Sequence, residues 1–236
     1  MKKIRFYLNK EFDKVMLEQF LDVLGGGIDF GKGIVRMYPE LEDAKKESDI
    51  SKKRKLVSSF CNTFYKKNKK QILVLTKKIE KEWRKVEEEY FNITKKYFEN
   101  FDFPKGKYIA YASIVNCNPR FLDSKTFQFY YKKDIADAVH TIAHEIMHFI
   151  FFDFVEKNMK KEISVLTEDE LWDLSEIFNY VVLKSNLYKS IVDKKVIRYY
   201  PDHKDVIKSI DTKLVTRVGI KDFIVHSIKK IKAAKG

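Results

Sequence analysis

The segment from Asp134 to Val155 constrains the fold of this chain more than any other. It predicts a helix that begins at Asp134, a residue type suited to capping an N-terminus. The helix is apolar on nearly every side, as in IAHEIMHFIFF. Because a helix that is hydrophobic all round is buried, we expect this one to lie in the core. His144, Glu145 and His148 are the polar side chains that interrupt its buried surface.

The pattern of the other segments predicts an α+β fold in a single domain, 1–236. The expected strands are 3–8, 108–115 and 126–131, the last of which alternates between two faces. The expected helices, besides 134–155, are 11–24, 42–66, 69–100, 167–183, 203–210 and 220–233. Within the domain, one strand and the long helices occupy 1–107, the site core occupies 108–183, and 184–236 is helical. The glycines at 25–27, 31 and 33 lack the GxGxxG spacing of a phosphate-binding turn, so we expect a loop there.

The chain is strongly basic: its 236 residues include 47 basic and 34 acidic side chains, a net charge of +13. Such a charge suggests a nucleic-acid partner. Only seven of the basic residues are arginine, the residue on which base and phosphate recognition relies. The lysines are spread over the chain and are densest at 52–55 (KKRK) and 66–70 (KKNKK). We therefore favour a solvated lysine-rich surface, with a nucleic-acid partner as the alternative.

Cysteine use and hydropathy indicate the cellular location. Cys61 and Cys117 are too few for a disulfide framework, which favours a reducing compartment. The basic start MKKIRFYLNK has no long apolar run behind it, so we expect no secretory signal. No stretch approaches the roughly 18 apolar residues of a membrane span. We expect a cytoplasmic protein without a membrane span.

The polar residues of the apolar helix have the spacing of a metal-binding motif, His144-Glu145-x-x-His148. Residues four apart lie one turn apart on the same face of a helix, so both imidazoles can bind one ion. Catalytic zinc typically has three protein ligands and an open position for water. Glu145 can reach that water and accept its proton. The motif therefore predicts one Zn²⁺ ion and hydrolytic chemistry.

Glu176 is the candidate third ligand. It is the only charged residue between Leu174 and Leu183, in a helix that is apolar nearly all round. Its carboxylate should therefore be buried, and a buried carboxylate requires compensation. A metal ion would supply it, whereas a structural role would need a lysine or arginine from elsewhere in the chain. We favour the metal.

The motif HEIMH, with Glu176 on its own helix 28 residues after His148, resembles the gluzincin branch of zinc metallopeptidases. The resemblance covers roughly residues 108–183. It implies that His144, His148 and Glu176 bind zinc and that Glu145 is the general base. It also implies a zincin-like fold, in which a small sheet of the N-terminal half packs on the metal-binding helix and the C-terminal half is mostly helical.

The resemblance also assigns residues around the metal. An edge strand that precedes the metal-binding helix would pair with an extended substrate by β-augmentation. Here that strand would be 108–115, with Ala112 and Ser113 nearest the metal. Many members carry an aspartate about one turn after the ligand glutamate, which orients the first histidine. This chain has Asn179 there, which can still accept a hydrogen bond from imidazole.

The oxyanion of a tetrahedral intermediate needs a hydrogen-bond donor. The resemblance implies a tyrosine or histidine from the C-terminal half, and RYYPDHKD offers Tyr199, Tyr200 and His203. We expect His203 to serve first and Tyr200 second. The other interpretation of this cluster is a helix entry with aromatic packing. His140, one turn before His144, is expected to be half-exposed, with a role in the site as the alternative.

These features together predict a zinc metallopeptidase that acts on extended peptides. One alternative is a non-catalytic basic binding or regulatory protein on a zincin scaffold, with nucleic acid as the partner. A second is a deformylase-like amidase with Cys117 as third ligand, although VNCNPRF differs from the cysteine motif of deformylases. A third is a purely structural metal site. Structural zinc sites usually have four protein ligands, and only three good ones can be found here, which argues against this alternative.

Overall fold

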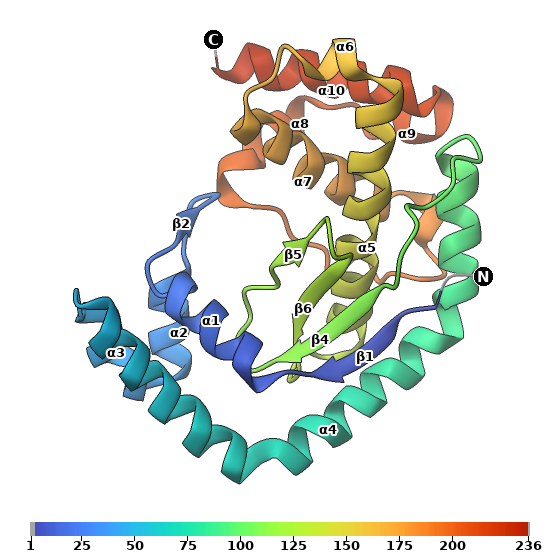
Figure 1. The fold of residues 1–236 in the computed structure, drawn as a ribbon. Helices are drawn as coiled ribbons and strands as arrows, with labels where there is room; N and C mark the ends of the chain where they lie inside the picture. Colours follow the sequence, from blue (N-terminus) through green and yellow to red (C-terminus); the bar gives the residue numbers. More distant parts are fainter. Residues whose placement is uncertain (1–2, 236) are drawn as a thin grey trace.

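The computed structural model describes residues 3–235 and has an α+β fold. The main sheet contains, in spatial order, β1 (Arg5–Leu8), β4 (Ile109–Ser113), β6 (Thr126–Tyr130) and β5 (Arg120–Phe121) (Figure 1). The first three strands are parallel, and β5 is antiparallel to β6. The three predicted strands are confirmed, whereas two-residue strand β5 is too short for the sequence pattern to indicate.

Strand β4 lies inside the sheet, so the expectation of an edge strand at 108–115 is wrong. β1 and β6 flank it, and both pair with it through backbone hydrogen bonds. The edges of the sheet are β1 and β5. Residues 126–129 are buried on both faces of β6. The side chains of this strand therefore alternate in residue type, as expected, but not in exposure to solvent.

Helix α5 (Ile135–Asn158) is buried along most of its length, as its apolar sequence predicts. It contacts β6, α4 and α7, and Figure 1 shows it between the sheet and the C-terminal helices. Asp134 occupies the N-cap position, although its side chain makes no capping hydrogen bond. Helix α7 (Glu168–Lys184) begins with a capping box formed by Thr167 and Glu170. Because α5 and α7 pack on each other, side chains 144–148 and 176 can meet.

Helix α4 (Ile50–Tyr97) is one continuous helix of 48 residues, so the prediction of separate helices at 42–66 and 69–100 is wrong. The lysine-rich stretch at its middle continues the helix because lysine has a favourable helix propensity. Figure 1 shows α4 bent around the outside of the molecule. Near its middle, Asn68 and Thr76 donate side-chain hydrogen bonds to carbonyl groups four residues earlier, which bends helices.

The glycine-rich segment forms a hairpin and a helix rather than the expected loop. β2 (Leu24–Gly25) and β3 (Ile28–Asp29) pair, and the chain turns at Gly26 and Gly27 with φ of +58° and +78°. A two-residue hairpin turn of type I′ needs positive φ at both central residues, which glycine adopts without steric cost. Gly31 and Gly33 lie in helix α2 (Phe30–Met37).

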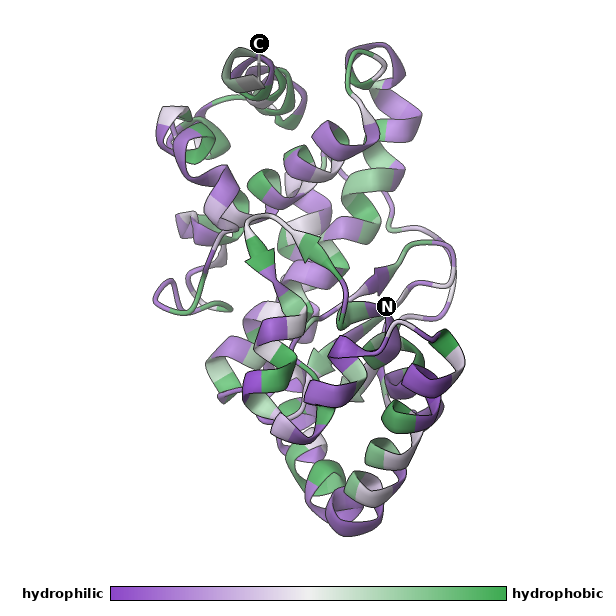
Figure 2. Cartoon of the chain, turned by 90° about the vertical axis from the view of Figure 1, so that its left-hand side faces the viewer, coloured by the Kyte–Doolittle hydropathy of each residue, from purple (hydrophilic) through white to green (hydrophobic). Residues whose placement is uncertain are grey.

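The other helical elements surround this framework. They are α1 (Lys10–Phe20), α3 (Glu42–Lys46), α6 (Lys160–Ile163), α8 (Lys204–Ser209), α9 (Leu214–Arg217), α10 (Ile220–Lys235) and 3₁₀ turns at Pro39–Leu41, Asn186–Tyr188 and Pro201–His203. The predicted helices at 203–210 and 220–233 are confirmed, and α1 ends earlier than predicted. Hydrophobic and hydrophilic residues alternate along most helices, as expected for amphipathic helices on a core (Figure 2). None of the helices between residues 3 and 235 is both long and apolar enough to cross a membrane.

Candidate metal centre

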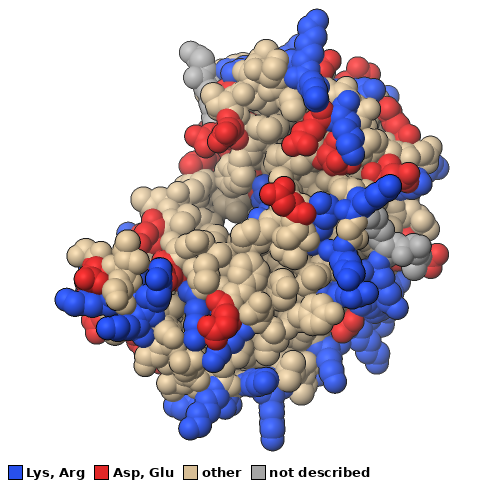
Figure 3. Space-filling view, viewed as in Figure 1, with Lys and Arg blue, Asp and Glu red and all other residues tan. Residues whose placement is uncertain are grey.

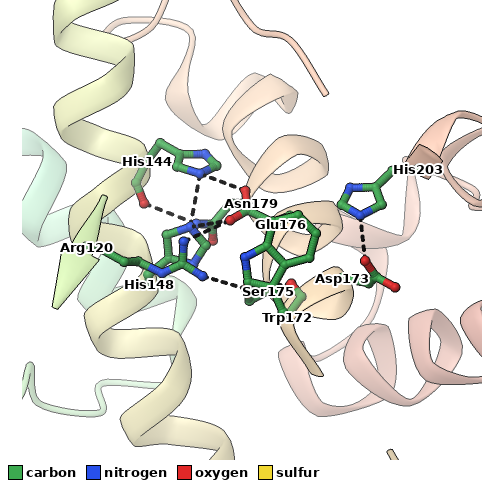
Figure 4. A network of polar contacts seen from close by, with 9 residues as sticks. All are labelled: Arg120, His144, His148, Trp172, Asp173, Ser175, Glu176, Asn179 and His203. Carbon is green, nitrogen blue, oxygen red and sulfur yellow. Dashed lines mark hydrogen bonds and ion pairs between the residues drawn. The ribbon is translucent and has the colours of Figure 1, made fainter. Parts of the chain in front are cut away.

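Two histidines on α5 and one glutamate on α7 converge on a single point. His144 and His148 lie one helical turn apart, and their Nε2 atoms are 3.0 Å from each other. The two carboxylate oxygens of Glu176 lie 3.1 Å from Nε2 of His144 and 3.3 Å from Nε2 of His148. Figure 4 shows the two rings and the carboxylate directed toward one another. The convergence of these three predicted ligands is the central geometric feature of the site.

The spacing of the two imidazole nitrogens and of the carboxylate oxygen nearest to each fits a tetrahedral ion. A zinc ion about 2.0–2.1 Å from each ligand would set neighbouring ligand atoms roughly 3.3 Å apart. The observed separations are 3.0, 3.1 and 3.3 Å. In the part of the chain that the structure describes, His144, His148 and Glu176 form the one group of at least three potential ligands that meets this test of closeness. Imidazole and carboxylate together suit zinc.

Arg120 is a further partner of Glu176 that sequence reasoning missed. Its Nη1 donates to Oε1 of Glu176 at 2.9 Å, and its Nη2 contacts Ser175 Oγ at 3.4 Å. It enters from the antiparallel edge strand β5, and its guanidinium lies over the ring of Phe152. Arg120 therefore supplies the cationic compensation that a structural role of Glu176 would require. Burial of Glu176 is therefore not by itself evidence for a metal. The evidence is that the two imidazole nitrogens lie close to each other and to the Glu176 carboxylate.

The electrostatic state of His148 and Glu176 suits metal binding, whereas the raised pKa of His144 opposes it. Burial, followed by the charge of Arg120, holds the pKa of His148 well below its usual value, so this ring is neutral. Burial raises the pKa of Glu176, but the two histidines outweigh it and hold that pKa well below its usual value. Burial lowers the pKa of His144, but Glu176 and Glu145 outweigh it and raise that pKa. A neutral imidazole and an ionised carboxylate are the forms that bind metal.

Glu145 is buried beside the ligands without a structural partner. Its side chain is only 5% exposed, and its Oε2 atom has no hydrogen-bond partner among the described residues. Burial raises the pKa of Glu145 to about 7. A buried carboxyl group without a hydrogen bond is costly and calls for an explanation. A proton-accepting role explains it, because the ideal pKa of a general base lies near the operating pH.

Asn179 does not have the expected contact with an imidazole. Its Nδ2 donates to the main-chain carbonyl of His144 at 3.1 Å, so it holds the backbone of α5 rather than the ring. Asn179 Oδ1 and His148 Nδ1 are both buried and lack hydrogen-bond partners among residues 3–235. The expectation that Asn179 orients the first histidine through its ring is therefore wrong, because the amide faces the helix backbone.

The cluster opens into a cavity of about 480 Å³ that also receives the expected oxyanion donors. Tyr199, Tyr200 and His203 all line it. His203 is 3% exposed, and its Nε2 lies 2.8 Å from Oδ1 of Asp173. Figure 4 shows this pair beside the metal cluster, with Trp172 between them. The structure thus brings the three candidates to the same cavity, and it reveals Asp173 as a partner that the sequence did not indicate.

Ala112 and Ser113 are not available to a substrate. They are 1% and 0% exposed and lie on the internal strand β4. Ser113 Oγ donates to Oδ1 of Asp13 at 2.7 Å. The prediction that both residues bind substrate is wrong, because β1 and β6 already use the backbone groups on either side of them.

Two other residues named from the sequence line the cavity without joining the ligand cluster. His140 is 9% exposed, which contradicts the expectation of a half-exposed residue, and burial lowers its pKa to about 3. Cys117 is a free thiol, and burial raises its pKa to about 12. Its sulfur does not belong to the group of ligand atoms that His144, His148 and Glu176 form. The geometry therefore does not favour the deformylase-like arrangement.

The basic clusters of α4 are partly neutralised. Lys53 is buried, with its Nζ 2.5 Å from Oδ2 of Asp22, and Arg54 forms two hydrogen bonds with Glu18. Lysines 66, 67, 69 and 70 are exposed. In the space-filling view, lysine and arginine side chains gather along the lower and right margins (Figure 3), where Figure 1 shows α4.

Comparison with known proteins provides no relative: no family model, no curated protein and no solved structure matches this chain. The likeness to gluzincins consequently rests on the motif residues and on the geometry of the cluster. Of the residues missed, Arg120 had a weak signal, since it is the one arginine near the metal-binding helix in sequence. Asp173 had no such sequence signal, because an acidic residue in the first turns of a helix is commonplace.

Proposed function

We propose that this protein is a zinc metallopeptidase of the gluzincin type that hydrolyses peptide bonds. The observation that carries the proposal is the convergence of His144 Nε2, His148 Nε2 and the Glu176 carboxylate at separations of 3.0–3.3 Å. Three ligands leave a fourth position open, as in catalytic zinc sites. The free thiols of Cys61 and Cys117 support a cytoplasmic location.

A zincin-like fold is part of this proposal. Helix α5 carries the motif and packs on a mixed sheet, and α7 brings the third ligand. The edge strand next to the cluster is β5 rather than β4, and its Arg120 reaches Glu176. We infer that an extended substrate lies along the outer edge of β5, where backbone groups can add a strand.

The chain's own residues then perform the reaction. When bound, zinc would lower the pKa of water and polarise the scissile carbonyl. Glu145 accepts a proton from the attacking water at its unpartnered Oε2 and returns it to the leaving amine. Arg120 donates to Oε1 of Glu176 and fixes its position, which leaves Oε2 directed at His144.

His203 and Tyr200 are the proposed donors to the oxyanion. His203 Nε2 faces Asp173, and its Nδ1 has no hydrogen-bond partner among the residues that the structure describes. Asp173 would fix the orientation of the imidazole, as carboxylates do for catalytic histidines. Removing one oxyanion donor typically costs about 2.7–4 kcal/mol of transition-state stabilisation.

The test combines metal content with turnover. Zinc-loaded protein should cleave unstructured casein, and Glu145→Gln should keep one zinc per chain while it loses cleavage by about a hundred-fold or more, as general bases contribute 10²–10⁴-fold. Glu156→Gln, on the same helix, is the matched control and should cleave normally. Undiminished cleavage by Glu145→Gln would exclude Glu145 as the base.

The exposed lysines of α4 favour a second candidate, a non-catalytic basic protein that binds nucleic acid. Lysines 66, 67, 69 and 70 lie on one helix at the surface. Binding would fall steeply with salt and would weaken when these lysines and 52–55 are neutralised. Retention on DNA and RNA columns at about 50 and 200 mM salt tests it, and absence of salt-sensitive retention would remove this candidate.

A further inference from the structure

We propose that the tip of the β2–β3 hairpin and the Tyr200–Asp202 turn form a bridge over the candidate metal centre, and that this bridge parts to admit an unfolded segment of a polypeptide. The proposal rests on the proposed function and specifies its substrate class. A folded surface would be excluded by the bridge, whereas an extended chain can enter when the contact opens.

The bridge is a close contact between two segments far apart in the sequence. A Cβ atom added to Gly26 would lie 2.9 Å from the Cβ atom of Tyr200 and would overlap its ring. A Cβ atom added to Gly27 would lie 3.1 Å from the Cβ atom of Pro201 and 2.7 Å from Oδ1 of Asp202. Glycine is thus required here twice, for the positive φ of the turn and for the approach to residues 200–202.

The bridge closes one side of the cavity that holds the metal ligands. Ile28 and Phe30 line this cavity from the hairpin side, and Tyr200 and His203 line it from the turn. His144 on α5 and Glu176 on α7 also line it. Figure 1 shows the hairpin reaching up to the segment before α8, and Figure 3 shows the surface hollowed beneath their junction. A chain that reaches the cluster from this side must pass under the junction.

The contact between the hairpin and the Tyr200–Asp202 turn is weak enough to open. Among the described residues, no hydrogen bond or ion pair joins hairpin residues 24–29 to residues 199–203, so only van der Waals contact holds the two sides. Leu24 is 76% exposed and Ile28 is 37% exposed, which leaves the hairpin with little apolar anchorage. Segments with few buried contacts open at low cost. The hairpin can therefore move aside while the sheet and α5 keep the ligands in place.

A reversible covalent lock tests the bridge. The Gly27→Cys/Pro201→Cys variant places two Cβ atoms about 3.1 Å apart, and this separation must widen by about 0.4 Å to reach the 3.5–4.5 Å of a disulfide. Native Cys61 and Cys117 are buried, so oxidation should join the introduced pair. The substrates are one peptide, chosen from a casein bond that the wild-type protein cuts, in linear and head-to-tail cyclic forms. The cyclic form has no end to thread through a closed bridge.

The reduced variant should cut both peptides, and the oxidised variant should retain one zinc per chain but lose cleavage of the cyclic peptide by at least ten-fold. On a Glu145→Gln background, fluorescence anisotropy should show the same loss of cyclic-peptide binding without turnover. Equal cleavage of the cyclic peptide in both redox states would overturn the bridge. If the reduced variant cut only the linear peptide and not the cyclic one, the claim that the bridge opens would be wrong. Failure of the wild type to cut casein would instead refute the proposed function, and the bridge proposal with it.

A second pair of variants needs no disulfide. Gly26→Ala drives a methyl group into Tyr200 and also strains the turn, whose φ there is +58°. An alanine at Gly25 meets no atom within 4 Å and controls for an added methyl group in the same hairpin. On the Glu145→Gln background, Gly26→Ala should bind the cyclic peptide at least three-fold more tightly than Gly25→Ala, and amides of residues 24–29 should exchange faster with deuterium. Equal affinity and equal exchange in the two variants would contradict the proposal.

Discussion

Asp13 joins the sheet to the helices that support the site, and its replacement gives a quantitative test of the fold. The residue lies on α1, is 0% exposed and accepts four hydrogen bonds. The donors are Tyr65 Oη at 2.5 Å, Ser113 Oγ at 2.7 Å, Gln128 Nε2 at 2.8 Å and the main-chain N of Ile114 at 3.0 Å. They come from α4, β4, β6 and the chain just after β4. One carboxylate thus holds four segments together.

Two opposing effects set the cost of Asp13→Ala. Hydrogen bonds to a charged group contribute about 1.5–2 kcal/mol each at the lower end of their range, or about 6–8 kcal/mol for four. Burial of the carboxylate opposes this and outweighs the four hydrogen bonds in their effect on the pKa of Asp13, which rises from its ordinary value near 3.8 to about 6. We expect Asp13→Ala to lower the free energy of unfolding by about 3 kcal/mol near pH 7, as the loss of a buried hydrogen-bond network does.

Asp13→Asn should be far milder. The asparagine oxygen can accept from Tyr65 and Ile114, and its NH₂ group can donate to Ser113 and to Oε1 of Gln128 once that amide turns over. Oε1 of Gln128 has no hydrogen-bond partner among residues 3–235 in the native arrangement, so the turn costs no existing bond. We expect a change within about 1–2 kcal/mol, typical of a conservative substitution that keeps its hydrogen bonds.

The pH dependence gives the sign of the Asp13 effect. The folded-state pKa exceeds the unfolded one, so the native state binds this proton more tightly. The resulting stabilisation is complete below pH 3.8 and is lost as the pH rises through 6. Between pH 4 and 7, wild-type protein should therefore lose about 2–3 kcal/mol of unfolding free energy relative to Asp13→Asn.

Urea unfolding of the metal-free proteins, followed by circular dichroism at pH 4, 5, 6 and 7, measures these differences. The comparison of two variants at each pH cancels the titration of all other groups. A wild-type-minus-Asn difference that stays constant from pH 4 to 7 would refute the high pKa of Asp13. Unchanged stability of Asp13→Ala would refute the role of the four hydrogen bonds.

Further predictions concern the metal and the proposed donors. Glu176→Gln should weaken zinc binding in equilibrium dialysis beyond the 10–100-fold typical of outer-shell changes, while Cys117→Ser should leave it unchanged. A loss of zinc binding in Cys117→Ser but not in Glu176→Gln would favour the deformylase-like arrangement. For the proposed oxyanion donor, Asp173→Asn should lower kcat about ten-fold or more, with zinc content and KM little changed, because it removes the carboxylate that faces His203. Asp173→Glu should restore part of kcat, and equal rates in all three proteins would exclude a positioning role.

The ligand cluster could be predicted because its signals are local. Helical spacing places His144 and His148 on one face regardless of tertiary structure. The apolar surroundings of Glu176 identify it as a carboxylate that folding must bury, and it is 5% exposed. Capping residues similarly set the start of α7. Such features need only the residues within one or two helical turns.

The order of the strands could not be predicted, because it depends on contacts over long distances in sequence. β1 adds to β4 across about a hundred residues, and this makes β4 internal and removes Ala112 and Ser113 from the site. Arg120 reaches Glu176 from 56 positions away, and no periodicity reports such a pairing. The length of α4 differs from the prediction for a different reason: the boundary expected between residues 66 and 69 falls in a lysine-rich stretch, and lysine favours helix.

X-ray absorption at the zinc edge of the purified, zinc-loaded protein tests the central claim most directly. The account predicts one zinc per chain with two imidazole nitrogens and oxygen ligands at about 2.0–2.2 Å. The signal should lose one imidazole in His148→Ala and should not change in Cys117→Ser. A sulfur ligand at about 2.3 Å, or a chain that binds no zinc at all, would contradict it.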